Sequence, residues 1–334
     1  MKPVIFGLSG PALTDDERAF FREAEPLGYI LFKRNCVDPA QMRALTDDLR
    51  ALHGRDDLPI TIDQEGGRVA RMQPPVWPAF PTGAAFDALY ERAPISAIEA
   101  VRANGQALAH ILREAGVNVD LAPMLDVRIP DGTPAIGDRA FGAEPMRVAA
   151  LGRAMLDGLN RGGVAGVIKH MPGHGRALVD SHLELPRVRA TAEELEADLL
   201  PFQRLHQAPI GMTAHIVFDA WDPELPATLS PKVIGEIIRG RIGFDGLLLT
   251  DDIDMKALSG TAGEKAERAL AAGCDVVLDC WARMPEMVEI AGRIPDAPAV
   301  CLDRLARAMG SVSEAEDVPL AELLAKRDAL LGLR

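Results

Sequence analysis

The sequence has few cysteines and few aromatic residues. Its 334 residues include four cysteines, and aromatic residues make up 4% of the chain. Cys274 and Cys280 are the closest pair, and their spacing matches none of the usual zinc motifs. We therefore expect reduced, buried thiols, as in a cytosolic protein, rather than a disulfide framework or a structural metal site.

Long hydrophobic runs are also lacking. No segment approaches the roughly 20 apolar residues that a membrane-spanning helix needs, and the first apolar run is too short for a signal peptide. Lys and Arg number 36 against 49 Asp and Glu, a net charge of −13. This charge argues against a nucleic-acid or anionic-membrane partner. We expect a cytoplasmic protein that acts on a small molecule.

What the chain does contain is a regular alternation of short apolar segments with helical patterns. N-cap signals open several of the helices, for example Thr14 with Glu17 and Ser96 with Glu99. The apolar segments that we expect to be strands are 4–8, 29–32, 60–63, 117–121, 164–169, 210–213, 246–250 and 275–278. This order predicts a (β/α)₈ TIM-type barrel, with a doubly wound open sheet as the alternative. No linker or repeat stands out, so we expect one domain over residues 1–334.

Polar residues stand at the ends of five of these segments, where a charge is otherwise costly. The carboxyl ends of barrel strands meet at one mouth, where active sites lie, so these side chains should converge. The residues are Asp63, Asp126, Lys169 with His170, His215 and Asp251.

The loop after the fifth expected strand holds the densest group of reactive side chains. Residues 169–175 read Lys-His-Met-Pro-Gly-His-Gly, and residues 180–182 read Asp-Ser-His. A carboxylate beside an imidazole can fix its tautomer, so Asp180 and His182 are candidates for a proton-donating pair. Asp251 closes a buried strand and suits a nucleophile toward an electrophilic carbon. A helix N-cap is the alternative role for Asp251.

Two other functions remain open at this point. A metal-dependent barrel hydrolase would use His170, His174 and Asp251 as ligands, although Pro172 and Gly173 exclude the helix on which such histidine spacing is usual. A saccharide-binding protein on a degenerate barrel would bind without turnover.

Arginines and tryptophans in the expected loops have two interpretations each. The arginines could bind substrate oxygens or lie at the surface, and for the tryptophans we expect packing rather than stacking on a sugar. The residues are Arg68, Arg71, Arg139, Trp77, Trp221 and Trp281.

Taken together, these motifs resemble those of glycoside hydrolase family 3, in particular its single-domain bacterial β-N-acetylglucosaminidases of peptidoglycan recycling. The matching segments run in the family's order between about residues 60 and 255. They are Ile-Asp-Gln-Glu-Gly-Gly-Arg-Val at 62–69, Leu-Ala-Pro-Met-Leu-Asp-Val at 121–127, Gly-Asp-Arg-Ala-Phe-Gly at 137–142, the two segments of the loop above, Met-Thr-Ala-His at 212–215 and Thr-Asp-Asp at 250–252.

The resemblance implies a retaining exo-β-N-acetylglucosaminidase with Asp251 as nucleophile, His182 as acid/base and Asp180 as its partner. It implies a muropeptide substrate, terminal β-1,4-linked N-acetylglucosamine on 1,6-anhydro-N-acetylmuramic acid, and neither a metal nor an organic cofactor. A monomer is favoured. The residues that it implies for sugar binding are Asp63, Arg71, Arg139, Lys169, His170 and His215.

The chain departs from the family pattern in the same loop. Met171 stands where phenylalanine is common, and Arg176-Ala177 stands where Asp-Thr is common. The first change conserves apolar volume. The second is expected to alter contacts of the loop on the leaving-group side. Family members that are multi-domain β-glucosidases take a glutamate acid from a later domain, which this chain lacks, and this favours the glucosaminidase.

Overall fold

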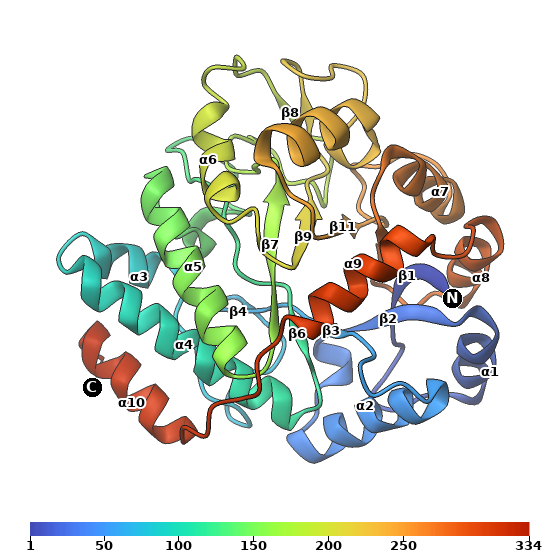
Figure 1. The fold of residues 1–334 in the computed structure, drawn as a ribbon, viewed down its shortest axis with the longest axis horizontal. Helices are drawn as coiled ribbons and strands as arrows, with labels where there is room; N and C mark the ends of the chain where they lie inside the picture. The colour runs from blue at the N-terminus through green and yellow to red at the C-terminus, as the bar shows by residue number, and fades with distance from the viewer. Residues whose placement is uncertain (334) are drawn as a thin grey trace.

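The computed structural model describes residues 1–333, and its centre is a closed barrel of eight parallel strands (Figure 1). Their order around the barrel is β1-β12-β11-β9-β7-β6-β3-β2. The strands are β1 (Lys2–Gly7), β2 (Pro26–Leu31), β3 (Ile60–Ile62), β6 (Val119–Asp120), β7 (Ala165–Met171), β9 (Ile210–Thr213), β11 (Leu247–Asp252) and β12 (Val276–Asp279). Each overlaps one of the eight expected segments, so the barrel prediction is confirmed and the open sheet is wrong.

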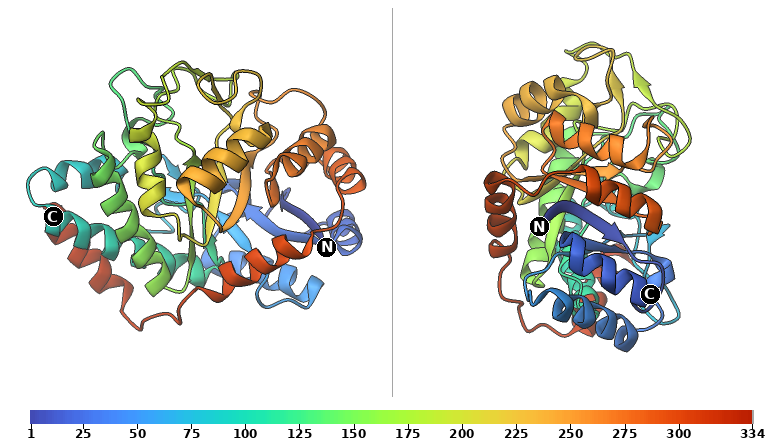
Figure 2. Two further views of the ribbon diagram at one scale, coloured as in Figure 1. Left: turned by 45° about the horizontal axis from the view of Figure 1, so that its top comes forward. Right: turned by 90° about the vertical axis from the view of Figure 1, so that its right-hand side faces the viewer.

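Helices surround the barrel (Figures 1 and 2). The surrounding helices are α1 (Asp15–Ala24), α2 (Pro39–His53), α4 (Pro94–Glu114), α5 (Pro145–Arg161), α6 (Glu196–Arg204), the π-helical η4 (Val233–Ile242), α7 (Ala262–Ala272) and α8 (Met284–Arg293). Thr14 and Glu17 form the expected capping box. Ser96 does not cap α4, because Pro94 already occupies the first turn and Ala93 is the N-cap.

The last two helices close the molecule. Helix α9 (Ala299–Gly310) adds Cys301 and Leu305 to the apolar cluster that fills the barrel, which includes Ile5, Val167 and Leu249. This helix lies at the N-terminal ends of the strands, so the barrel is open at the opposite end. Helix α10 (Leu320–Leu331) packs against α4, as both figures show.

Long connections gather at the carboxyl ends of the strands. They follow the third to sixth strands of the barrel in chain order. They contain the hairpin of β4 (Gln64–Gly66) and β5 (Val69–Ala70), α3 (Gly83–Tyr90), η2 (Gly137–Arg139), the parallel pair β8 (Arg187–Val188) and β10 (Val217–Phe218), and η3 (Ala227–Leu229), while the shorter η1 (Lys33–Asn35) follows β2. Such βα connections build the active face of a barrel.

The four cysteines are free, as predicted, and three of them are buried while Cys36 is half-buried. Within residues 1–333, no helix combines the length and the apolar composition that crossing a bilayer requires.

Candidate active site

A pocket of about 390 Å³ opens at the carboxyl end of the barrel. This volume suits one or two sugar rings, since pockets for small ligands begin at about 300 Å³. The resemblance assigned a catalytic or sugar-binding role to nine residues, and eight of them line this pocket. They are Asp63, Arg71, Arg139, Lys169, His170, Asp180, His182 and Asp251. The structure therefore brings together side chains from β7, β11 and the connections that follow β3, β6 and β7.

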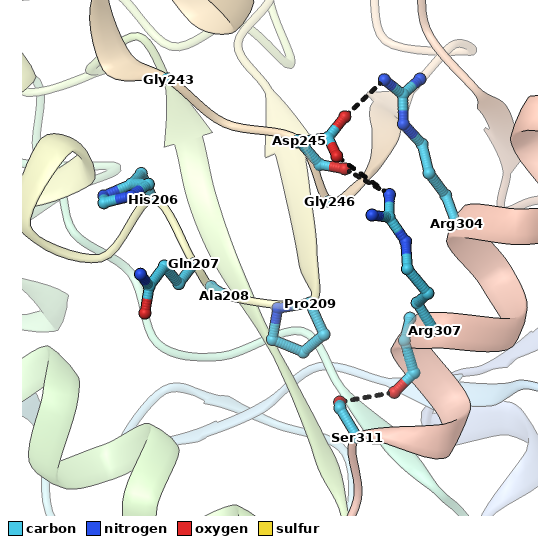
Figure 3. Close-up of a pocket in the computed structure, with 11 residues that line it drawn as sticks. His206, Gln207, Ala208, Pro209, Gly243, Asp245, Gly246, Arg304, Arg307 and Ser311 are labelled. Carbon is cyan, nitrogen blue, oxygen red and sulfur yellow. Dashed lines mark hydrogen bonds and ion pairs between the residues drawn. The ribbon is translucent and has the colours of Figure 1, made fainter.

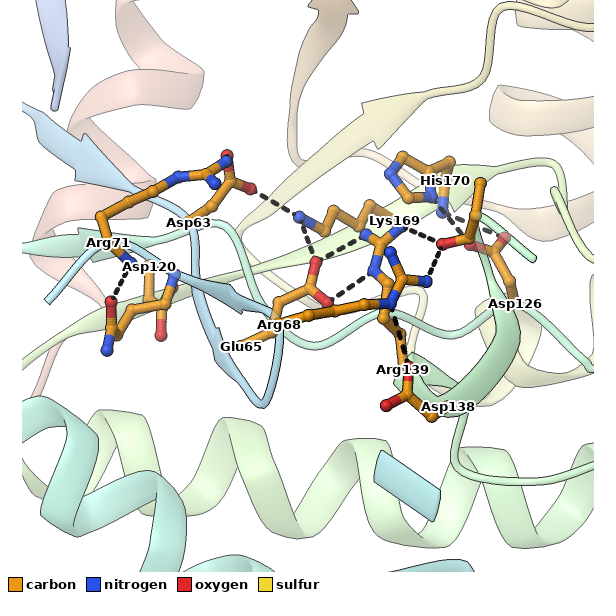
Figure 4. A network of polar contacts seen from close by, with 12 residues as sticks. Asp63, Glu65, Arg68, Arg71, Asp120, Asp126, Asp138, Arg139, Lys169 and His170 are labelled. Atoms are coloured by element: carbon orange, nitrogen blue, oxygen red, sulfur yellow. Dashed lines mark hydrogen bonds and ion pairs between the residues drawn. The ribbon is translucent and has the colours of Figure 1, made fainter. Parts of the chain in front are cut away.

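One wall of the pocket is a network of paired charges (Figure 4). The Lys169 Nζ lies 2.8 Å from Asp63 Oδ1 and 2.7 Å from Glu65 Oε1. Arg139 donates twice to Glu65, with Nη2–Oε1 at 2.7 Å and Nε–Oε2 at 2.9 Å. Arg71 Nη2 donates to Asp63 Oδ2 at 2.9 Å. The result is a rigid array of donors and acceptors, of the kind that binds sugar hydroxyls.

The network keeps its members ionised although they are buried. Burial would raise the pKa of the Asp63 carboxyl, but Lys169 and Arg71 hold it at about 2. Burial acts in the same way on Glu65, and Arg139 and Lys169 hold its pKa below the usual range. For Lys169, burial would lower the pKa, and the two carboxylates raise it instead. Opposite charges at this distance favour the charged forms of both partners.

Glu65 is a site residue that the sequence reading passed over. It stands two residues after Asp63, and side chains two apart along an extended segment point to the same side. That spacing was the available signal. Glu65 was not among the polar residues at the ends of the expected strands, because it belongs to β4, in the connection after β3.

His170 is oriented by the carboxylate of Asp126, which lies in the connection after β6. Its Nδ1 lies 2.7 Å from Asp126 Oδ2, and Asp126 Oδ1 accepts the backbone N–H of His174 at 2.6 Å. Burial would raise the pKa of Asp126, but His170 and His174 hold it lower. A carboxylate that accepts from Nδ1 fixes the imidazole tautomer and leaves Nε2 for the pocket.

Asp251 is a half-buried, ionised carboxylate near the end of β11. Its Oδ1 accepts the backbone N–H of Asp252 at 2.8 Å. Burial would raise the pKa of Asp251, but the nearby His170 and His215, the Asp252 N–H and, more weakly, His182 hold it below the usual range. The N-cap alternative is wrong, because the next helix, α7, begins at Ala262 and its N-cap is Thr261. An unprotonated carboxylate in a pocket suits nucleophilic attack.

Asp180 and His182 form a pair at the rim. Asp180 Oδ1 lies 2.8 Å from His182 Nδ1 and accepts the His182 backbone N–H at 3.0 Å. Burial would raise the pKa of Asp180, but these hydrogen bonds lower it. The His182 side chain is 68% exposed. Its other ring nitrogen, Nε2, is therefore accessible to a ligand in the pocket.

His215 lies elsewhere than expected. Its side chain is fully buried, with Nδ1 2.7 Å from Thr228 Oγ1 and Nε2 2.9 Å from the Asp252 carbonyl oxygen. Both ring nitrogens are thus engaged within the protein, and His215 is not among the residues that line the pocket. The structure places it as a support of the carboxyl end of β11, where Asp251 and Asp252 lie.

The proposed metal ligands do not assemble into a site. His170 Nδ1 faces Asp126, and His174 Nε2 lies 3.2 Å from Ser181 Oγ. Burial lowers the pKa of His174 to about 4. In the part of the chain that the structure describes, no three side chains of the metal-binding types form a cluster.

The three arginines and one of the tryptophans line the pocket, whereas the other two tryptophans are buried. Arg68 lines the pocket while its Nε pairs with Asp138 at 3.0 Å. Trp77 and Trp221 are buried, as expected for packing, whereas Trp281 is 57% exposed and lines the pocket.

A second pocket, of about 320 Å³, lies at the other end of the barrel, before β9 and β11 (Figure 3). Its two arginines, Arg304 and Arg307, are both paired with Asp245. The strand-end carboxylates and imidazoles lie far from this end, so the catalytic chemistry belongs to the mouth.

Comparison with known proteins gives a consistent result. Residues 12–306 match the model of the glycosyl hydrolase family 3 N-terminal domain. The β-hexosaminidase of Alkalilimnicola ehrlichii is 41% identical over 314 residues, covering 92% of this chain and 88% of that protein. NagZ from Neisseria gonorrhoeae in complex with N-trifluoroacetyl-D-glucosamine superposes with a TM-score of 0.85 at 30% identity, covering 99% and 98% of the two chains. A family 3 β-N-acetylglucosaminidase from Paenibacillus sp. gives a TM-score of 0.84 at 31% identity, covering 98% of this chain and 66% of that one.

Proposed function

The chain belongs to glycoside hydrolase family 3 and is a β-N-acetylhexosaminidase, and from this premise we propose how it acts and on what. The proposal is a retaining exo-β-N-acetylglucosaminidase that releases terminal β-1,4-linked N-acetylglucosamine from 1,6-anhydro-N-acetylmuramic acid muropeptides. The observation that carries it is the presence, in one pocket, of the ionised Asp251, the Asp180–His182 pair and a wall of charges suited to hydroxyl groups.

In the first step, His182 protonates the glycosidic oxygen while an Asp251 oxygen attacks the anomeric carbon. The bond from that carbon to the leaving oxygen breaks, and a glycosyl ester of Asp251 forms. In the second step, His182 removes a proton from water, which attacks the same carbon and frees Asp251. Two inversions give net retention of the β configuration. Asp180 orients the imidazole through Nδ1 in both steps.

The charge network holds the sugar during both steps. Lys169 pairs with Asp63, and Glu65 joins Lys169 to Arg139, so these side chains bind hydroxyls without reorganising. The oriented His170 presents Nε2 to the same ring. The ligand bound to NagZ from Neisseria gonorrhoeae is N-trifluoroacetyl-D-glucosamine. This compound is the trifluoro analogue of N-acetylglucosamine, which supports the choice of sugar.

Four free cysteines favour a reducing compartment, so we propose that the protein lies in the cytoplasm. We propose a monomer of one domain that needs neither a metal nor an organic cofactor, and whose partner is the saccharide or muropeptide alone.

The test is hydrolysis of 4-nitrophenyl β-N-acetylglucosaminide followed by proton NMR, with the β-glucoside as the comparison. We expect the N-acetyl substrate to be preferred, full activity after treatment with a chelator, and β-N-acetylglucosamine as the first product. First release of the α anomer would overturn the retaining mechanism. Equal turnover of the glucoside would overturn the sugar assignment.

A further inference from the structure

Trp281 differs from the other two tryptophans in that its ring is exposed. It follows β12 and lines the mouth of the pocket at 57% exposure, whereas Trp77 and Trp221 are exposed by 6% and 5%. Indole rings contribute most to stability when they are buried, and those left half in water at a binding site usually meet a ligand. We therefore expect a ligand to cover the exposed face of the Trp281 ring.

The ring is held in place although it is exposed. Its Nε1 donates to Asp252 Oδ2 at 3.1 Å, and Asp252 Oδ1 accepts the backbone N–H of Asp254 at 3.1 Å. The next residue, Ala282, has φ of 57°, in the left-handed region that residues with a Cβ disfavour. Arg283 pairs with both Asp254 and Glu286. The loop is thus fastened on both sides of the indole.

Contacts between loops place Trp281 and His182 on one continuous rim. The Ala257 backbone N–H donates to the Ser181 carbonyl oxygen at 3.3 Å, which joins the acid/base loop to the connection after β11. The Arg283–Asp254 pair joins that connection to the loop of Trp281. Since β12 is the neighbour of β11 in the barrel, Trp281 stands beside the nucleophile strand.

The buried charges that bind the cleaved sugar come from the opposite part of the mouth. Asp63 and Lys169 belong to the ends of β3 and β7, and both are enclosed by their ion pairs. A sugar anchored there presents its anomeric carbon toward Asp251. Because Asp251 attacks one face of that carbon, the leaving oxygen lies on the opposite face, on the side of His182. The leaving group then extends along the rim that carries both His182 and the exposed indole.

We propose that Trp281 is the platform of a subsite for the leaving-group sugar. The C–H face of a second β-linked pyranose stacks on the indole, and the Asp252 carboxylate fixes the angle of the ring. This inference rests on the proposed function. It narrows the substrate class to glycosides whose aglycone is itself a ring large enough to cover an indole, as in a disaccharide.

The kinetic test compares the wild type, Trp281→Ala and Trp281→Phe on N,N′-diacetylchitobiose and on methyl β-N-acetylglucosaminide, which has no aglycone ring. We expect Trp281→Ala to lower kcat/KM on the disaccharide roughly tenfold more than on the methyl glycoside, since a stacked ring contributes about that much. Trp281→Phe keeps a ring and should recover most of the difference. Equal losses on both substrates would mean that Trp281 acts only through Asp252, and would overturn the subsite.

A binding test separates this inference from the proposed reaction. In the Asp251→Asn background, calorimetry would compare N,N′-diacetylchitobiose with N-acetylglucosamine, with and without Trp281→Ala. We expect the second substitution to weaken disaccharide binding about tenfold and monosaccharide binding much less. If the wild type hydrolysed neither substrate, the proposed function would be wrong. The comparison of the disaccharide and monosaccharide affinities would still show whether Trp281 forms a subsite. Unchanged disaccharide affinity overturns the subsite.

Discussion

The Asp180 carboxylate holds the His182 imidazole through two contacts, one to Nδ1 at 2.8 Å and one to the backbone N–H at 3.0 Å. The residues lie two apart on an irregular loop, so their geometry depends on this contact rather than on a helix or strand. In the mechanism that we propose, this imidazole and its anionic partner take the place of the second carboxylate of an ordinary retaining glycosidase.

Replacing Asp180 with Asn keeps the shape of this pair and removes its charge. General acid catalysis contributes about 10²- to 10⁴-fold, and it matters most when the leaving group is a poor one. We expect kcat/KM to fall about 100-fold or more on a disaccharide and clearly less on a 4-nitrophenyl glycoside. Asp47→Asn, in an exposed pair with Arg43, is the control. Equal losses on both substrates would contradict a role for Asp180 in proton transfer.

Glu65 neutralises two buried cations, so its replacement should affect both folding and binding. Glu65→Gln leaves Lys169 with Asp63 alone and removes the bidentate partner of Arg139. Breaking a buried ion pair costs about 3–5 kcal/mol, and we expect urea unfolding to show a loss in that range together with a raised KM. Glu99→Gln, in a surface network with Lys326, should change stability by less than about 1 kcal/mol. Two equally small effects would contradict the structural role of Glu65.

Arg176, one of the departures from the family pattern, fastens the acid/base loop to α6. Its Nε lies 2.6 Å from Asp198 Oδ2, and its Nη2 donates to the Glu194 carbonyl oxygen at 3.0 Å. Arg176→Ala leaves the buried Asp198 carboxyl unpaired, which costs about 1–3 kcal/mol. We expect lower kcat and faster amide exchange across residues 173–186. Arg153→Ala, on the surface of α5, is the control. Unchanged exchange in that segment would show that Arg176 does not anchor the loop.

The burial of Asp279, at the end of β12, predicts that the free energy of unfolding depends on pH. It is 1% exposed, and burial together with the nearby Asp252 raises its pKa from 3.8 to about 7. The folded state therefore keeps a proton that the unfolded state releases, so the free energy of unfolding falls as pH rises between these values, by up to about 1.4 kcal/mol per pH unit. Above pH 7 this contribution stays constant.

Asp279→Asn should flatten this dependence, because an amide does not titrate. Urea unfolding of the wild type and the variant at pH 5, 6, 7 and 8 measures both slopes. The wild type should lose stability relative to the variant as pH rises. A difference that is independent of pH would show that the Asp279 carboxyl does not titrate in this range.

Periodicity and capping signals predicted the barrel because each depends on neighbouring residues. The eight apolar segments and the Thr14–Glu17 box are of this kind. The prediction that Ser96 caps α4 was wrong, because Pro94 occupies the first turn and sets the start of the helix.

The site was predictable where strand ends determine it and not where contacts between distant segments do. Asp63, Lys169 and Asp251 stand where their strands end, and they meet in one pocket. His215 also closes a strand, but Thr228 and the Asp252 carbonyl turn its ring into the interior. The exposure of Trp281 depends on loop contacts that no local pattern records.

Trapping of the covalent intermediate identifies the nucleophile. The protein would be incubated with a slow fluorinated N-acetylglucosaminide, digested, and the labelled peptide mapped by mass spectrometry. We expect one sugar per chain, attached through an ester to Asp251, and no label in Asp251→Ala. A label on another carboxylate, or full turnover by Asp251→Ala, would contradict this assignment.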